Sequence, residues 1–349
     1  MSIFVISLIL ALVFAAMAVA TRFVKALHGL GFTFAVLTVG SMAVMHPPLL
    51  ISWGGFELKR AIGPLVQLIL FGMGMSLTLA DFSRVVRMPK GIVLCCVLQF
   101  TVMPLGGYCF ARLFGLEGAV ATGLILIGSV PSGTSSNVIA LLARANVPLS
   151  VTVTAVSTII SPVVTPFLVR WLAGAYVQID TIAMMGSILK MIVAPLVLGL
   201  ILNRYLPAMA ARLVRVLPFT AMLAVCMVIG VTISLSREHL LAMGLAIFGA
   251  AACLNATGYL LGYFGGRLVG LNKTDARTTA LEVGIQNGGM ATGIAFDVLK
   301  SPAAALAAAV FGPWSAVTAS GLASWWRARP PEAETRHPTS MQPQPPNGH

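Results

Sequence analysis

Long apolar runs separated by short polar segments make up most of the chain. A helix that crosses a membrane needs about 20 mostly apolar residues, and eleven runs of roughly that length can be identified. They lie near residues 2–20, 29–50, 61–79, 91–113, 119–142, 149–171, 181–202, 216–234, 240–264, 278–298 and 303–326. A membrane β-barrel would instead show segments of about ten residues in which apolar and polar positions alternate. The pattern therefore predicts an all-α polytopic membrane protein.

The composition narrows the function classes. Of the 349 residues, 58% are hydrophobic and 9% are charged, whereas a soluble domain carries roughly 25% charged residues. This excludes an ordinary cytosolic enzyme, a disordered regulator and a disulfide scaffold. The five cysteines lie in or beside apolar runs and lack metal-binding spacing.

The net charge of +12 would suggest a nucleic-acid partner in a soluble protein, but in a membrane protein basic loops report topology. If the ten runs after the first alternate in direction, fifteen of the 22 Lys and Arg residues fall on one side and six on the other, and Lys190 lies inside a run. Basic loops face the cytoplasm. We therefore expect a multi-pass membrane protein with a cytoplasmic C-terminus and no nucleic-acid partner.

The two ends differ from the central unit, residues 23–326. Residues 1–22 end in small residues that resemble a signal cleavage site, but no Lys or Arg precedes the apolar run. We favour an extra transmembrane helix over a cleaved signal. Residues 327–349 are rich in proline and predict a disordered cytoplasmic tail.

Two runs contain polar and helix-breaking residues near the middle of the membrane. These segments are 128–137, which includes Pro131, and 282–289, which includes Gly288 and Gly289. Backbone released from helical hydrogen bonds at that depth needs protein or a watery cavity as its partner. The simpler interpretation is a pair of kinked helices with small residues for close packing. However, the two runs are the fourth and ninth of ten, matching positions of two five-helix halves, which is typical of transporters with inverted repeats. The halves share no clear residue-level repeat.

Glu282 is the one acidic residue well inside a run. A charge there costs roughly 2.5–3.5 kcal/mol, so we expect a bound cation as its partner, with an ion pair to Lys190 as the alternative. Oxygen-bearing side chains are plentiful in other runs: Ser150, Thr154, Ser157 and Ser161 share one helix face, and Gln99 and Asn255 lie in mid-run. One negative charge among neutral oxygens favours monovalent ions over Ca²⁺ or a transition metal.

Three motifs resemble the bile acid:sodium symporter family. They are Pro-Ser-Gly-Thr-Ser-Ser-Asn at 131–137, continued by 143–154, Gln-Phe-Thr-Val-Met-Pro at 99–104, and Glu-Val-Gly-Ile-Gln-Asn at 282–287. The resemblance covers about residues 25–327. It is to bacterial members of the family, and it implies a location in a bacterial inner membrane. It implies a ten-helix core of two inverted five-helix repeats, in which the broken fourth and ninth helices cross. It also implies panel helices at about 29–79 and 181–234, and core helices at about 91–171 and 240–326.

The resemblance further implies two sodium sites and one site for an organic anion. One sodium would be held by Ser136, Asn137, Ser150, Thr154 and Glu282. The other would be held by Gln99, Glu282 and Gln286, with backbone carbonyls near Val283 and Ile285. The anion would bind at the N-termini of the half-helices, where the candidates are Thr134, Asn287, Gly288 and Gly289.

The predicted function is sodium-coupled symport of a small organic anion by alternating access. The anion is expected to be bile acid-like, or a small carboxylate such as a pantoate- or pyruvate-like acid. Besides this anion and the lipid bilayer, we expect no obligate protein partner. The alternatives are proton coupling and a non-transporting sensor or channel of the same fold. An intramembrane enzyme is a more remote alternative, since the five histidines lie at run edges, in loops or in the tail.

Overall fold

The structure, a computed structural model, describes residues 3–21, 23, 31–78 and 88–329. The Pro-rich tail beyond Arg329, for which we predicted disorder, lies outside the described residues. The helices are α1 (Ile3–Ala20), α2 (Gly31–Met45), α3 (Ile62–Ser76), α5 (Pro89–Leu113), α6 (Gly118–Ser129), α7 (Ser135–Leu142), α8 (Val147–Ala173), α9 (Thr181–Ile188), α10 (Ala194–Tyr205), α11 (Pro207–Leu235), α12 (Arg237–Leu268), α13 (Lys273–Gly284), α14 (Gly288–Asp297) and α15 (Pro302–Arg327). A π-helical turn, η5 (Leu189–Val193), joins α9 to α10.

The apolar runs of the sequence coincide with these helices, so the all-α polytopic fold class is confirmed. Six helices of the described residues are long and apolar enough to cross a membrane, and α11, bent by 49° between Leu217 and Phe219, makes a seventh. The count falls short of eleven because α1 and α2 are short and because two runs are split into α6 with α7 and α13 with α14. The ten-helix count and the inverted repeat stay predictions.

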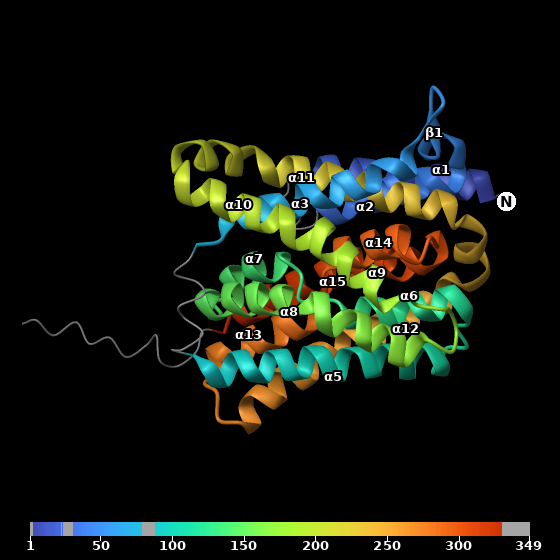
Figure 1. The fold of residues 1–349 in the computed structure, drawn as a ribbon. Coiled ribbons are helices and arrows are strands. Elements are labelled where there is room, and N and C mark those ends of the chain that lie inside the picture. Colours follow the sequence, from blue (N-terminus) through green and yellow to red (C-terminus); the bar gives the residue numbers. More distant parts are fainter. Residues whose placement is uncertain (1–2, 22, 24–30, 79–87, 330–349) are drawn as a thin grey trace, which may run out of the picture.

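The helices form two layers (Figure 1). The first contains α1, α2, α3, α10 and α11, where α1 packs on α2, α10 on α3, and α11 on both α2 and α3. The second contains α5 to α8 and α12 to α15, with α12 packed on α13 and α5, and α15 on α6. The layers meet where α14 packs on α3 and where α15 packs on α11. That these layers move as a panel and a core stays a prediction.

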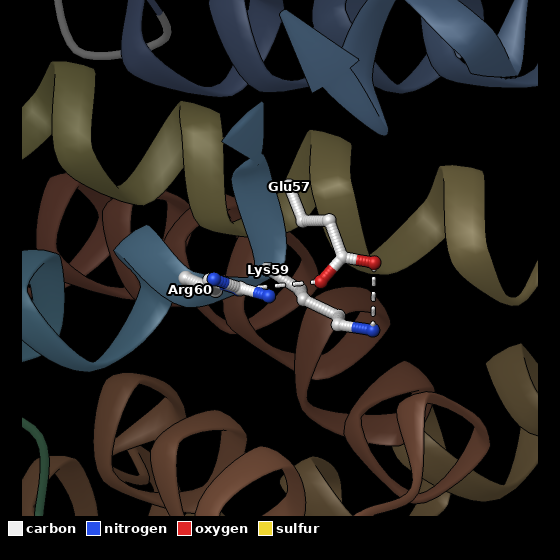
Figure 2. A network of polar contacts seen from close by, with 3 residues as sticks. All are labelled: Glu57, Lys59 and Arg60. Atoms are coloured by element: carbon white, nitrogen blue, oxygen red, sulfur yellow. Dashed lines mark hydrogen bonds and ion pairs between the residues drawn. The ribbon is translucent and has the colours of Figure 1, made fainter. Parts of the chain in front are cut away.

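A small hairpin projects at one end of the first layer, between α2 and α3 (Figure 1). Strands β1 (Ser52–Trp53) and β2 (Phe56–Glu57) pair antiparallel around Gly54 and Gly55, both of which have positive φ, as a tight two-residue turn requires. The hairpin follows η2 (Pro47–Leu50) and precedes η3 (Leu58–Ala61). Glu57, at the end of β2, forms ion pairs with Lys59 and Arg60 of η3, which are drawn in Figure 2. The Glu57 carboxylate lies 3.3 Å from Lys59 Nζ and 3.3 Å from Arg60 Nε. The hydrogen bond and charge of Lys59 hold the pKa of Glu57 below its ordinary value of 4.5.

Candidate functional site

Both interrupted runs break at the same place, and the breaks bond to each other. The residues that follow α6 and α13, Val130 and Ile285, are extended rather than helical. Ser132 and Gln286 then form an antiparallel bridge. On either side of it the Gly133 amide donates to the Ile285 carbonyl at 2.9 Å, and the Asn287 amide donates to the Pro131 carbonyl at 3.0 Å. The two breaks therefore supply each other with backbone partners inside the helix bundle.

The crossing requires glycine at position 133. A Cβ atom there would lie 2.6 Å from the Gln286 carbonyl oxygen, which is backbone and cannot rotate away.

Three backbone carbonyls at the breaks accept hydrogen bonds from side chains of three further helices, α8, α5 and α12. Thr165 Oγ1 donates to Ser129 at 2.8 Å, Gln99 Nε2 donates to Val130 at 2.7 Å, and Asn255 Nδ2 donates to Gly284 at 2.9 Å.

Of these supporting side chains, Thr165 was not predicted from the sequence. Asn255 was expected to contribute an oxygen to the cluster around Glu282, but it has a different role. Asn255 lies behind the break of α13 and accepts a hydrogen bond from Thr318, so it supports the backbone rather than joining the oxygen cluster of Glu282. The signal for Thr165 is weak, since it is a threonine between two prolines, Pro162 and Pro166, in an apolar run.

The five side chains expected at the first sodium site lie together. Ser150 Oγ donates to Glu282 Oε1, and Thr154 Oγ1 donates to Glu282 Oε2 at 2.8 Å. Asn137 Oδ1 lies 2.8 Å from Ser150 Oγ and 3.4 Å from Thr154 Oγ1, and Ser136 Oγ lies 3.4 Å from Thr154 Oγ1. Three helices converge here: α7, α8 and α13. All of these side chains are buried except Asn137, which is half-buried.

The chemistry of this cluster suits a monovalent cation. Its three hydroxyl groups carry one hydrogen each, while carboxylate, amide and hydroxyl oxygens offer many more lone pairs. The hydrogens are thus too few for the oxygen contacts, and the carboxylate adds one negative charge. In the described part of the chain, no three His, Cys, Asp or Glu side chains gather into a metal site. A cation would supply the missing positive charge among these oxygens.

Of the residues expected at the second sodium site, Gln99 and Gln286 lie together, but the Glu282 carboxylate bonds elsewhere. Gln99 and Gln286 face each other with their side-chain amides, Gln99 Nε2 lying 2.5 Å from Gln286 Oε1. Gln286 Nε2 donates to the Val283 carbonyl at 2.7 Å, whereas the Ile285 carbonyl bonds to Gly133 in the crossing. The carboxylate of Glu282 bonds to Ser150 and Thr154 instead.

The substrate candidates surround the crossing from two helix N-termini. Asn287 is the N-cap of α14 and accepts a hydrogen bond from the Met290 amide at 3.0 Å, while its Nδ2 is buried and has no partner among the residues that the structure describes. Thr134 is the N-cap position of α7, and Gly288 and Gly289 are half-buried in the first turn of α14. An orphaned amide donor beside two positive helix ends suits an oxyanion.

Lys190, the basic residue considered as an alternative partner of Glu282, lies elsewhere. Lys190 is exposed on η5, and the bonds of Glu282 go to hydroxyl groups. Arg277 directly precedes the run at 278–298 and is one of the fifteen basic residues expected in loops on the cytoplasmic side. It is instead buried in α13, where it bonds to the carbonyls of Ala143 and Trp326. The correction has a physical reason, since these carbonyls end α7 and α15 and need donors at the C-terminal, negative ends of the helices.

Sequence similarity to known proteins places the chain in a family. Residues 63–243 match the Sodium Bile acid symporter family. The sodium-dependent transporter YocS of Bacillus subtilis, named as uncharacterized, is 33% identical over 303 residues, which are 86% of this chain and 93% of that protein. "Probable sodium/metabolite cotransporter BASS1, chloroplastic" of Oryza sativa subsp. japonica is 34% identical over 307 residues, 86% of this chain and 73% of that protein. Its counterpart in Arabidopsis thaliana is 34% identical over 267 residues, 76% of this chain and 67% of that protein. The chain thus belongs to the sodium bile acid symporter family, a family of sodium-coupled membrane transporters.

Proposed function

We propose that this protein couples the entry of a small organic anion to the entry of sodium, with the Glu282 cluster as an ion site. The observation that carries this proposal is that the Ser150 and Thr154 hydroxyls bond to the Glu282 carboxylate. The Ser136 hydroxyl and the Asn137 amide oxygen lie beside these hydroxyls. Sodium dependence in the names of the relatives supports the same conclusion.

A second sodium would bind between Gln99, Gln286 and Glu282, with backbone oxygens near Val283 and Ile285. Binding there requires the Gln286 amide to turn away from the Val283 carbonyl, which it now contacts at 2.7 Å. Two sodium ions with one monoanion carry one net positive charge inward. This charge contributes roughly 2.3 kcal/mol per 100 mV of membrane potential.

The substrate would be an anion that presents a carboxylate or sulfonate to the crossing. Asn287 Nδ2, which is buried and has no partner in the described part of the chain, would donate to it. The first turns of α7 and α14 would add backbone donors at Thr134, Gly288 and Gly289. A bile acid-like molecule and a small carboxylate such as a pantoate- or pyruvate-like acid both satisfy this chemistry.

The expected membrane arrangement is a ten-helix core of two inverted halves, in a bacterial inner membrane with the C-terminus in the cytoplasm. One parallel between the halves supports it: Gln99 of α5 bonds to the carbonyl after α6, and Asn255 of α12 bonds to the last carbonyl of α13. Alternating access would move the core against the panel. Ser187 of α9 lies in the expected panel segment 181–234, and Asp297 of α14 lies in the expected core. The hydrogen bond from Ser187 to Asp297 would therefore break during this movement.

The test is a melting-temperature screen of organic anions on the purified protein, with sodium or potassium as the sole cation, followed by uptake into proteoliposomes. A ligand that binds the folded state raises its apparent stability, and coupling between sodium and the anion must be reciprocal. We expect an anion that stabilises only in sodium and whose uptake saturates. Uptake that follows pH and ignores sodium would instead establish proton coupling, and flux that does not saturate would establish a channel.

A further inference from the structure

Asn146 joins α8 to α13 just before the Glu282 cluster. Its Nδ2 donates to Asp275 Oδ1 at 2.7 Å, and its backbone amide donates to Thr278 Oγ1 at 2.8 Å. The Thr278 hydroxyl in turn contacts the Asn146 carbonyl at 3.3 Å. Asn146 also caps α8, because its Oδ1 accepts a hydrogen bond from the Leu149 amide at 3.1 Å. One residue therefore fixes the start of α8 and ties it to the first turns of α13.

The link lies in line with the ion ligands on both helices. On α8, Asn146 is followed at steps of four by Ser150 and Thr154, so all three share a face. On α13, Thr278 precedes Glu282 by four residues and shares its face. The interface between α8 and α13 thus has two successive sets of contacts. Asn146 bonds to Thr278, and one turn further on Ser150 and Thr154 bond to Glu282.

We propose that Asn146 is a positioning residue of the ion site, which sets the distance between the hydroxyls of α8 and the carboxylate of α13. This inference rests on the proposed function of the Glu282 cluster. Its physical basis is that ions are selected by the spacing of their ligands, and that residues holding the ligands tune affinity without touching the ion. Asn146 lies one helical turn from the nearest ligand, so a change there acts through the helices.

Asn272 provides a matched control at the same end of α13. It is the N-cap of α13, accepts from the Asp275 amide at 2.8 Å, and donates from Nδ2 to Asp275 Oδ2 at 3.0 Å. Serine is as good an N-cap residue as asparagine, so Asn146→Ser and Asn272→Ser each retain a cap and each remove one side-chain bond to Asp275. Only the first of these bonds joins α8 to α13.

The experiment measures equilibrium binding of ²²Na⁺ to purified full-length protein, with Li⁺ as competitor, and the melting temperature of each variant. We expect Asn146→Ser to raise the sodium dissociation constant by about tenfold, the lower end of the effect that loss of a residue supporting a metal site has, and to change the preference for Na⁺ over Li⁺. Asn272→Ser should leave both unchanged. Thr278→Val should reproduce the effect, and the double variant with Asn146→Ser should add little to it.

A purely structural role would lower the melting temperature but leave the preference for Na⁺ over Li⁺ at the wild-type value, and this result would overturn the proposal. Equal sodium affinity in Asn146→Ser, Asn272→Ser and wild type would also overturn it. Failure of the wild type itself to bind sodium would instead count against the proposed function. The two failures are therefore distinguishable.

Discussion

The Thr154 hydroxyl donates a 2.8 Å hydrogen bond to the Glu282 carboxylate across the interface of α8 and α13. The two residues are 128 positions apart, and they meet because the breaks in two runs bond to each other. Asn137, from the helix that follows the first break, lies beside the Thr154 hydroxyl and the Ser150 hydroxyl, the two groups that donate to the carboxylate. The crossing of the two broken runs therefore determines where the oxygen-bearing side chains of the cluster lie.

Asn137→Ala should weaken sodium binding by about tenfold or more, because it removes an oxygen that lies among the proposed ligands. Ser157→Ala is the control, since the Ser157 hydroxyl is buried on the same helix as Thr154 but bonds to the backbone carbonyl of Thr154 at 3.1 Å. The sodium dependence of the melting temperature reports both. Equal sodium affinity in the two variants would count against a ligand role for Asn137.

Asn287→Asp should abolish the stabilisation by the anion while leaving that by sodium alone. An aspartate retains the oxygen that caps α14 for the Met290 amide but replaces the orphaned donor by an acceptor, and its charge repels an anion. The measurement is the melting temperature with sodium, with and without the anion. An unchanged response to the anion would place the substrate elsewhere.

Gly133→Ala should destabilise the fold by about 1–3 kcal/mol, the usual cost of inserting atoms into a packed interior. The added Cβ would press on the Gln286 carbonyl oxygen and separate the breaks. Gly312→Ala in α15 is the control because nothing lies within 4 Å of its Cβ position. It should be neutral or stabilising by up to about 1 kcal/mol. Denaturant unfolding in detergent compares the two, and equal stability would show that the crossing tolerates a side chain.

Glu57→Gln should leave sodium-stimulated uptake at pH 7 unchanged, because Glu57 lies on the hairpin between α2 and α3, and its ion pairs within the described ranges are with its neighbours Lys59 and Arg60. Its pKa is lowered in the folded state, so its ion pairs add stability above its ordinary pKa and lose it as the pH falls through the lower folded value. Exposed pairs of this kind contribute little. Any difference in melting temperature from wild type should thus be small at pH 7 and vanish in acid, and a loss of uptake would show an unforeseen role for the hairpin.

The sequence revealed the fold class because lipid demands long apolar helices, and it revealed Glu282 because a carboxylate stands out among apolar residues. The polar segments around Pro131 and Gly288 also marked the breaks. What the sequence could not show was which side chain bonds to which carbonyl. Thr165 and Asn255 resemble ordinary polar residues in apolar runs, and their roles at the breaks depend on how distant helices pack. The burial of Arg277 was missed for the same reason, since a basic residue at a run edge resembles a topology signal.

The most direct test of the central claim is saturation binding of ²²Na⁺ to the purified wild-type protein and to Glu282→Gln, which keeps the shape of the side chain and removes its charge. We predict saturable binding approaching two ions per wild-type chain and its loss in the variant, with both proteins folded by their melting curves. Saturable sodium binding of equal affinity in Glu282→Gln would contradict the assignment of the oxygen cluster as the ion site.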